Sequence, residues 1–361
     1  MKIKVSIVIV TWNGARYIKE CLQSVLRQQD VNFIKIDDNS SEDKQGSSAN
    51  HAEIIVIDND SADETVSIIE NNFSDYVSLV KQRSNLGFAA TYNRGIHWSR
   101  GEYILILNQD VVLSDNFLSI LISFLDAYDK IGVAIGKVLR CSFPFQPTNI
   151  IDSLGLSINS KAQVTDIAAG QVDQGTAGEA VPVFGFSGAV ALLRRRALFE
   201  AKYNNQFFDE EFISYKEDVD LSWRLRWLNW DIVYVPEAVA YHHRSARAGK
   251  ESSGWGNNLA IAKNYLAKPD FINFLSYRNH LFVLIKNLPW LLAIKYGPKI
   301  AWYEFKKMVF VAVVKPKIFW QTLRDLIVQL PLLISKRRYI MKRRRIKPKA
   351  LELWIKQTTS H

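Results

Sequence analysis

The feature that most constrains the fold of this chain is a series of apolar, β-branched runs, each followed by polar residues and then by a segment with helical periodicity. The runs Val5–Val10, Ile54–Ile57 and Tyr103–Leu107 are typical of strands that are buried on both faces of a sheet. Apolar residues recur at helical spacing over residues 15–29 and 88–99. Strands that alternate with helices of this length predict an α/β fold with a mostly parallel sheet.

One stretch of the sequence occurs twice. Residues 33–42 resemble residues 54–63, but only one copy can form the central strand. We expect the second copy to do so, because Lys35 in the first copy is unfavourable in a strand that is buried on both faces. The small and polar residues 43–51 then predict an inserted surface loop. Residues 140–182 lack strong periodicity and predict a long loop or an excursion over the edge of the sheet.

Polar side chains follow three of the predicted strands, at the edge where ligands bind to open α/β sheets. They are Thr11 and Asn13, Asp58 and Asp60, and Asn108, Gln109 and Asp110. Asp58 could accept hydrogen bonds from a base or a ribose, and Asp110 beside an amide could hold a divalent cation between two phosphates. Each motif taken alone could equally be a strand-ending turn or a helix cap.

Two further groups of titratable residues come later in the chain. Glu217, Asp218 and Asp220 crowd the start of a predicted helix, and their repulsion should raise the pKa of at least one carboxyl, as a general base requires. The alternative is an acidic helix start that the helix dipole favours. His242 could complete a cation site begun by Asp110, although a single histidine can also be structural.

Several classes of protein are disfavoured by what the sequence lacks. It contains no GxxxxGK[ST] loop, no GxGxxG after the first predicted strand and no GxSxG elbow, which argues against P-loop, dinucleotide-binding and hydrolase sites. Two cysteines, Cys21 and Cys141, are too few for a disulfide framework and fit a reducing compartment.

Positive charge is concentrated at the end of the sequence. Residues 295–361 contain 17 Lys and Arg against 3 Asp and Glu, a net charge of +14, which leaves −4 for the preceding residues. A nucleic-acid-binding protein is therefore disfavoured, because its charge should coat the working domain. Apolar runs alternate with cations over residues 271–340, and Lys336–Arg345 holds seven cations, a pattern of interfacial helices on an anionic membrane. The alternative is a helical bundle that packs on the preceding domain.

We expect neither a signal peptide nor a transmembrane span. The apolar run Val5–Val10 is too short for a signal-peptide core, and no stretch reaches 18 uncharged apolar residues. The expected location is the cytoplasm, with the protein peripheral on the cytoplasmic face of the membrane. Residues 244–258, which include three glycines and Trp255, predict either a mobile lid or a disordered connector.

Seven stretches in sequence order, from residue 3 to residue 250, together resemble family 2 glycosyltransferases with the GT-A fold, and among them the rhamnosyltransferase-like branch. The stretches are Val5–Asn13, Ile55–Thr65, Asn85–Gly95, Tyr103–Val112, Gly185–Arg196, Phe208–Leu225 and Val235–His242. The resemblance implies a GT-A nucleotide-diphospho-sugar transferase domain over residues 1–265. A helical, basic, membrane-associating region would follow over residues 266–361.

The resemblance also implies roles for individual residues. Asp218 matches the catalytic base, and Asp110 and His242 match ligands of Mg²⁺ or Mn²⁺. The donor-binding residues would be Thr11, Asn13, Asp58, Asp60, Asn85, Asn108 and Gln109. The residues on the acceptor side or in support of the site would be Glu217, Trp223 and Arg224.

The implied function is an inverting transfer of rhamnose or a related hexose from a nucleotide-diphosphate donor, with dTDP-rhamnose favoured. The acceptor would be a lipid-linked molecule or a saccharide in surface polysaccharide or cell-envelope synthesis. Asn108 replaces the first carboxylate of the family's DXD motif, and no insert like residues 31–51 belongs to the family pattern. Both departures support the alternative, a non-catalytic protein that binds nucleotide sugars or polysaccharide on the same fold.

Overall fold

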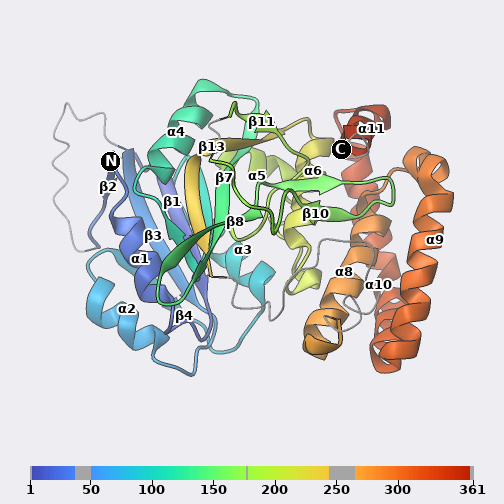
Figure 1. Ribbon diagram of the computed structural model, residues 1–361, viewed down its shortest axis with the longest axis horizontal. Coiled ribbons are helices and arrows are strands. Elements are labelled where there is room, and N and C mark those ends of the chain that lie inside the picture. Colours follow the sequence, from blue (N-terminus) through green and yellow to red (C-terminus); the bar gives the residue numbers. More distant parts are fainter. Residues whose placement is uncertain (1, 37–49, 176–177, 244–264, 358–361) are drawn as a thin grey trace.

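A large mixed sheet forms the centre of the computed structural model, which describes residues 2–36, 50–175, 178–243 and 265–357 (Figure 1). Its strands are β1 (Val5–Thr11), β2 (Val31–Phe33), β3 (Asn50–Asp58), β4 (Val77–Lys81), β5 (Tyr103–Asn108), β6 (Val111–Leu113), β7 (Ile131–Ser142), β8 (Gln146–Ser153), β11 (Val181–Pro182), β12 (Val190–Arg194) and β13 (Asp231–His242). The main order is β11-β13-β7-β12-β5-β1-β3-β2. Strands β5, β1, β3 and β4 are parallel, whereas β12 is antiparallel to β5 and β7.

Helices cover both faces of this sheet. The helices on one face are α1 (Ile18–Leu26), α2 (Thr65–Phe73) and α4 (Phe117–Ala127), and those on the other are α3 (Phe88–Trp98), α5 (Arg195–Ala201) and α6 (Glu217–Trp227). Val5, Ile7 and Ile9 of β1 pack on the first set, and Val8 packs on the second. The apolar run of β1 is therefore continuous because both of its faces are buried.

Of the two similar stretches, residues 33–42 and 54–63, the second takes the place in the fold that we expected. The second copy forms β3, which pairs in parallel with β1 on one side and with β4 on the other. The first copy begins with Phe33, the last residue of β2, which pairs with Ala52 near the beginning of β3. The predicted inserted loop at residues 43–51 lies almost entirely outside the described residues.

The prediction of a long loop over residues 140–182 is wrong. This segment contains β8, the hairpin of β9 (Leu156–Ile158) and β10 (Val164–Asp166), and β11, and β7 extends into it as far as Ser142. Three of these strands have only two or three residues. Such short strands cannot produce a detectable alternation of apolar and polar residues.

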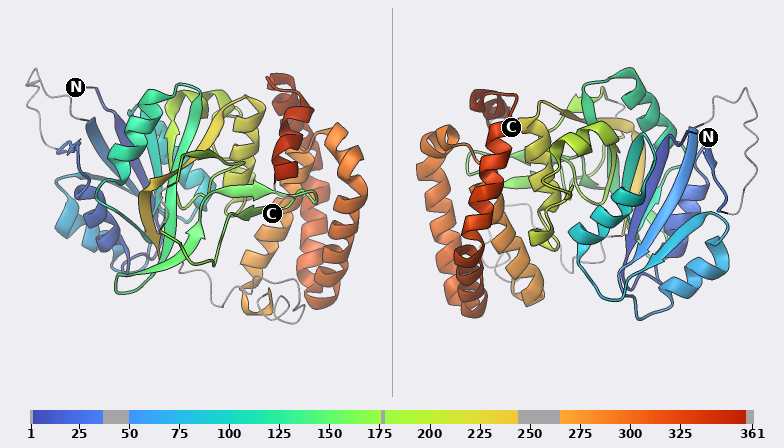
Figure 2. Two further views of the ribbon diagram at one scale, coloured as in Figure 1. Left: turned by 45° about the horizontal axis from the view of Figure 1, so that its top comes forward. Right: turned by 180° about the vertical axis from the view of Figure 1, so that it is seen from behind.

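Four helices from the C-terminal part of the chain pack together at one end of the molecule (Figures 1 and 2). They are α8 (Asp270–Asn287), α9 (Trp290–Val314), α10 (Pro316–Arg343) and α11 (Pro348–Gln357). Trp223 and Trp227 of α6 share one apolar cluster with Phe282 of α8 and with Leu333 and Ile340 of α10. The core thus continues across residue 265, where we predicted a domain boundary. Within the described part of the chain, no helix has a segment long and apolar enough to cross a membrane.

Candidate active site

The sheet brings together the polar residues that end three neighbouring strands. Thr11 of β1 is in register with Asp58 of β3, and Val10 is in register with Asn108 of β5. Because the carboxyl ends of these parallel strands meet at one edge, the predicted donor-binding residues form one group. The side chain of Asn108 is partly exposed, and its Oδ1 atom accepts a long hydrogen bond of 3.4 Å from the hydroxyl of Tyr92.

Asp58 is buried, and only one of its two carboxylate oxygens has a hydrogen-bond partner in the described part of the chain. Its Oδ2 atom accepts a hydrogen bond from the backbone N–H of Ser61 at 3.0 Å. Its Oδ1 atom has no hydrogen-bond partner among the described residues. A buried oxygen without a hydrogen-bond partner costs free energy, so an N–H or O–H group of a bound base or ribose would stabilise it. Asp60 is exposed nearby and has a positive φ of 69°.

Thr11 and Gln109 bind to each other, which sequence analysis did not foresee. The hydroxyl of Thr11 donates to Oε1 of Gln109, which also accepts from the backbone N–H of Trp12 at 2.9 Å. The Nε2 atom of Gln109 donates to the carbonyl of Trp12 at 3.1 Å. These bonds hold the ends of β1 and β5 together and leave these two side chains little capacity for a ligand. Asn13 is exposed, and its Oδ1 atom accepts from the N–H of Ala62 at 2.8 Å.

Asn85 belongs to a small amide network that orders the entry to α3. Its Oδ1 atom accepts hydrogen bonds at 2.9 Å from Nδ2 of Asn59 and from the N–H of Gly87. Asn59 is buried, and its own Oδ1 atom accepts from the N–H of Leu86 at 2.9 Å. Sequence analysis missed Asn59, although its place directly after Asp58 at a strand end was a usable signal.

Asp110 and His242 face each other at the same edge of the sheet. Nε2 of His242 lies 3.4 Å from Oδ1 of Asp110, and Nδ1 of His242 lies 2.9 Å from Oδ2 of Asp152 on β8. Burial alone would lower the pKa of His242, but Asp110 and Asp152 together raise it to about 9. A metal-binding histidine usually donates from one ring nitrogen to a carboxylate, carbonyl or water, and Asp152 could take this part for His242.

This pair fits a divalent cation that is shared with a substrate. Among the described residues, no three His, Cys, Asp or Glu side chains form a group that could hold a metal alone. Mg²⁺ in phosphate-transfer and related sites is commonly held by one or two carboxylates together with substrate phosphates and water. Asp110 and His242 could supply the protein's share of such a site.

Asp218 lies at the start of α6 and is linked through the backbone to the strand ends. Its Oδ2 atom accepts from the N–H of Gly188 at 2.8 Å, and the carbonyl of the next residue, Ala189, accepts from the N–H of Asn108 at 2.8 Å. Two hydrogen bonds therefore link Asp218, the predicted base, with Asn108 of the predicted donor site. Burial raises the pKa of Asp218, while its side chain stays partly accessible.

Glu217 precedes Asp218 and is buried. Burial first, and then the neighbouring charge of Asp218, raise the pKa of Glu217 to about 8. Its Oε2 atom has no hydrogen-bond partner in the described part of the chain. The repulsion that we predicted among these carboxyls is therefore present at Glu217.

Trp223 and Arg224 support α6 from inside the core. Trp223 is 1% exposed and packs edge-on against Phe184, with 5.2 Å between the ring centres. Arg224 pairs with Asp220 at 2.9 Å, and its guanidinium also donates to the carbonyls of Ala201 and Phe207. Neither side chain reaches the surface where an acceptor could bind, so their contribution is to hold the helix in place.

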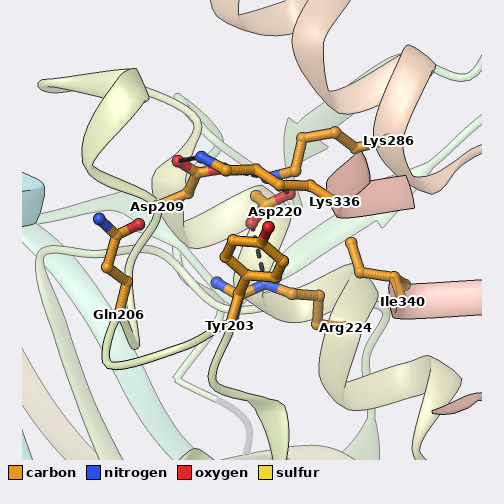
Figure 3. Close-up of a pocket in the computed structure, with 8 residues that line it drawn as sticks. All are labelled: Tyr203, Gln206, Asp209, Asp220, Arg224, Lys286, Lys336 and Ile340. Carbon is orange, nitrogen blue, oxygen red and sulfur yellow. Dashed lines mark hydrogen bonds and ion pairs between the residues drawn. The ribbon is translucent and has the colours of Figure 1, made fainter. Parts of the chain in front are cut away.

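A buried group of charges joins α6 to the C-terminal helices (Figure 3). Lys286 of α8 pairs with Asp209 and, at 2.7 Å, with Asp220, and Lys336 of α10 pairs with Asp209 at 2.6 Å. Burial alone would raise the pKa of Asp209, but the two lysines hold it well below its usual range. The sequence did not reveal this cluster, because Lys286 and Lys336 lie in the segment that predicted interfacial helices, and their acidic partners are distant in the chain. The predicted lid at residues 244–258 lies outside the described residues.

The model of the family described as glycosyl transferase family 2 matches residues 6–47 and 44–199. The chain belongs to this family. Poly-beta-1,6-N-acetyl-D-glucosamine synthase of Staphylococcus epidermidis is 28% identical over 193 residues, which are 52% of this chain and 42% of that protein. N-acetylglucosaminyl-diphospho-decaprenol L-rhamnosyltransferase of Mycobacterium tuberculosis is 40% identical over 70 residues, which are 19% of this chain and 22% of that protein. The chain thus spans less than half the length of these family 2 relatives.

Solved structures show that this family 2 chain has the predicted GT-A fold. GalNAc-T7 with UDP, GalNAc and Mn²⁺ is similar at a TM-score of 0.55 and 14% identity, over 79% of this chain and 48% of that chain. TarS of S. aureus is similar at a TM-score of 0.50 and 15% identity, over 90% of this chain and 55% of that chain. At these identities the likeness establishes the fold and leaves donor and acceptor to be derived from the site.

Proposed function

We propose that the protein is an inverting glycosyltransferase that moves a sugar from a nucleoside-diphosphate donor to an acceptor in cell-surface polysaccharide synthesis. The observation that carries the proposal is the connection from Asp218 through Gly188 and Ala189 to Asn108 at the strand ends. Through this connection the carboxylate of Asp218, which is partly accessible and has a raised pKa, lies close to the polar strand-end residues that could bind a nucleotide. Membership of family 2 supports the same reaction class.

The reaction needs one displacement. Asp218 takes the proton of the acceptor hydroxyl while that oxygen attacks the anomeric carbon, and the nucleoside diphosphate leaves from the opposite face, which inverts the configuration. Asp58 accepts hydrogen bonds from the nucleoside and fixes the donor. A divalent cation held by Asp110 and His242 would offset the charge of the diphosphate.

We favour dTDP-rhamnose as the donor and a lipid-linked saccharide as the acceptor. The support is the rhamnosyltransferase-like motif set and the similarity to the mycobacterial rhamnosyltransferase, which acts on a diphospho-decaprenol. The similarity to the staphylococcal N-acetylglucosamine polymer synthase supports UDP-N-acetylglucosamine as the next donor to test. Both relatives support a role in the cell envelope.

A lipid-linked acceptor requires the protein to work at a membrane, and we place it on the cytoplasmic face as a peripheral protein. Large apolar side chains of α9 and α10 support this location, because Trp302, Val313, Trp320 and Ile327 are each more than 60% exposed. Soluble proteins rarely leave such a surface uncovered.

The test is a screen of the purified protein for nucleoside-diphosphate release from a panel that includes dTDP-rhamnose and UDP-N-acetylglucosamine, with Mg²⁺ or Mn²⁺ present. We expect one donor to be turned over, slowly by hydrolysis and faster once an acceptor is supplied. The alternative, a non-catalytic nucleotide-sugar-binding protein, predicts donor binding by calorimetry with no diphosphate release. That result would overturn the proposed activity.

A further inference from the structure

The loop that leads into the candidate catalytic helix has a strained backbone. It runs from residue 212 to residue 216, between the short helix η1 (Glu210–Phe212) and α6. Ile213, Tyr215 and Lys216 have φ values of 63°, 70° and 74°, a region that residues other than glycine seldom adopt. Such conformations persist only where the surrounding structure holds them, and they cluster at functional sites. Because Asp218 follows two residues later, the path of this loop determines where Asp218 lies.

One buried amide of the C-terminal region holds this loop. Asn279 of α8 is completely buried, and its Nδ2 atom lies 2.8 Å from each of the carbonyl oxygens of Phe212, Ser214 and Tyr215, which share its two N–H hydrogens. The three acceptors span the strained stretch from its beginning to the residue before Lys216. A single side chain thus contacts the backbone of the loop at three carbonyl groups.

The orientation of this amide is itself determined. Arg278 donates from Nε to Oδ1 of Asn279 at 3.0 Å, so the Nδ2 side of the amide must point at the loop. The guanidinium of Arg278 is anchored by Asp325 of α10 at 3.0 Å and donates to the carbonyl of Glu211 at 2.7 Å. Two helices of the C-terminal region therefore cooperate in presenting the amide of Asn279.

The opposite side of the loop contacts α3, which adjoins the donor site. The backbone N–H of Ala89 donates to the carbonyl of Ile213 at 3.0 Å, and that of Phe88 donates to the hydroxyl of Ser214 at 3.3 Å. The loop is thus held between α3 and α8. If the contact with α8 were lost, the strained residues would be held from one side only.

We propose that Asn279 is a positioning residue for the transfer reaction: it holds loop 212–216 so that Asp218 meets the acceptor hydroxyl. This inference rests on the proposed function, because it needs Asp218 to be the base. It also assigns α8, which lies beyond the boundary predicted at residue 265, to the catalytic unit. A misplacement of about 1 Å at a reacting group can cost about 100-fold in rate, which sets the scale of the effect.

The test compares Asn279→Ala and Asn279→Asp with Asn273→Ala in the full-length protein. Asn279→Asp keeps the shape of the side chain and removes its donors. Asn273 is a matched control, because it lies on the same helix, is 3% exposed and donates from Nδ2 to the carbonyls of Tyr265 and Lys268, outside the loop. The readouts are kcat and acceptor KM with the donor found by the screen, donor affinity by calorimetry, the melting temperature and hydrogen exchange of amides 212–218.

We expect both Asn279 variants to lose kcat by about 100-fold with donor affinity unchanged, and amides 212–218 to exchange faster. Asn273→Ala should lose a similar amount of thermal stability and keep kcat. The inference is overturned if kcat falls equally in the Asn273 and Asn279 variants, or if the amides of the loop exchange as in the wild type. Asp218→Asn measured in parallel separates the two proposals: turnover by that variant overturns the proposed base, whatever Asn279 does to the loop.

Discussion

At the scale of single residues, the proposed chemistry depends most on the Asp218 carboxylate. Asp218→Asn keeps the size of the side chain and its ability to accept from Gly188, but an amide cannot take the acceptor proton. We expect sugar transfer to fall by about 10²–10⁴-fold while the dissociation constant of the donor stays the same. Diphosphate release and calorimetry measure the two quantities. Transfer at the wild-type rate would exclude Asp218 as the base.

Glu217 should make stability depend on pH. The folded protein holds its proton up to a pKa of about 8, whereas an unfolded chain releases it near 4.5, so the folded state binds more protons between these values. The free energy of unfolding contributed by this group therefore decreases as pH rises through that window. Glu217→Gln stays neutral, and we expect its melting temperature relative to the wild type to increase from about pH 5 to about pH 9.

Thermal unfolding of the two proteins across this range measures the effect. A difference in melting temperature that does not change with pH would show that Glu217 is ionised in the folded state at all of these values. Tyr128→Phe is a control for a substitution at an exposed side chain outside α6.

The site residues that could be predicted from the sequence are those at the end of a predicted strand or at the start of a predicted helix. Asp58, Asp110 and Asp218 could be proposed because each follows or begins a recognisable element. The bond between Thr11 and Gln109 could not be proposed, because it joins two strands that are 98 residues apart in the chain. Lys286 and Lys336 were misjudged for the same reason: their burial depends on acidic partners that only tertiary packing brings near.

At the scale of elements, β8 and β13 together determine how His242 is presented. Asp152 on β8 lies 2.9 Å from Nδ1 of His242, so that Nε2 is the atom directed at Asp110. We expect Asp152→Asn to weaken the binding of Mn²⁺ in the presence of a nucleoside diphosphate by about 10–100-fold, which is usual for such supporting carboxylates.

Titration of Mn²⁺ by electron paramagnetic resonance with UDP or dTDP present measures this affinity directly. Asp173→Asn is the matched control, because Asp173 pairs with Lys137 on β7 at 2.9 Å and does not contact His242. Removal of the metal with a chelator should abolish the Mn²⁺ signal and lower diphosphate affinity in the wild type. Equal affinity for Mn²⁺ in the wild type and in Asp152→Asn would contradict the role given to Asp152.

The elements that could be predicted from the sequence are those long enough to show a continuous apolar run or a helical spacing of apolar residues. The parallel strands β1, β3 and β5 and the helices α3 and α6 agree with the predicted segments, because the strands contain continuous apolar runs and each helix extends over 11 residues. The strands β9 and β10, of three residues each, do not. Pairing between β13 and β7 shifts register between Val235 and Val239, so the alternation along this long strand is interrupted there.

At the scale of the whole molecule, the basic region after residue 265 has an inner side, which packs on the rest of the chain, and an outer side. Lys336 is buried against Asp209, and Arg337 and Arg343 donate to backbone carbonyls, so the cluster Lys336–Arg345 is less available to a membrane than its sequence suggested. The outer side is apolar instead. The large exposed apolar side chains of α9 are Trp290, Leu291, Ile294, Trp302, Phe305, Met308, Val309 and Val313.

These eight residues fall on one side of α9 when it is viewed along its axis, at 3.6 residues per turn. Lys299 and Lys306 are exposed along one border of the stripe. An apolar face with a lysine border matches the interface of a bilayer with anionic headgroups. Figures 1 and 2 show α9 at the end of the molecule away from the large sheet, so this face could contact a membrane while the candidate site stays open.

The final prediction tests this face without relying on catalysis. The double variant Trp302→Ala/Val313→Gln should lose most of its co-sedimentation with vesicles of phosphatidylglycerol and phosphatidylcholine, because it removes two side chains that are 61% and 76% exposed. Trp98→Ala is the matched control, since Trp98 on α3 is 52% exposed and lies outside the C-terminal helices. Binding of the wild type should weaken with added salt and with neutral vesicles, because part of the attraction is electrostatic. If the double variant sediments with anionic vesicles as the wild type does, the apolar face of α9 is not the membrane contact, and the lipid-linked acceptor loses its structural support.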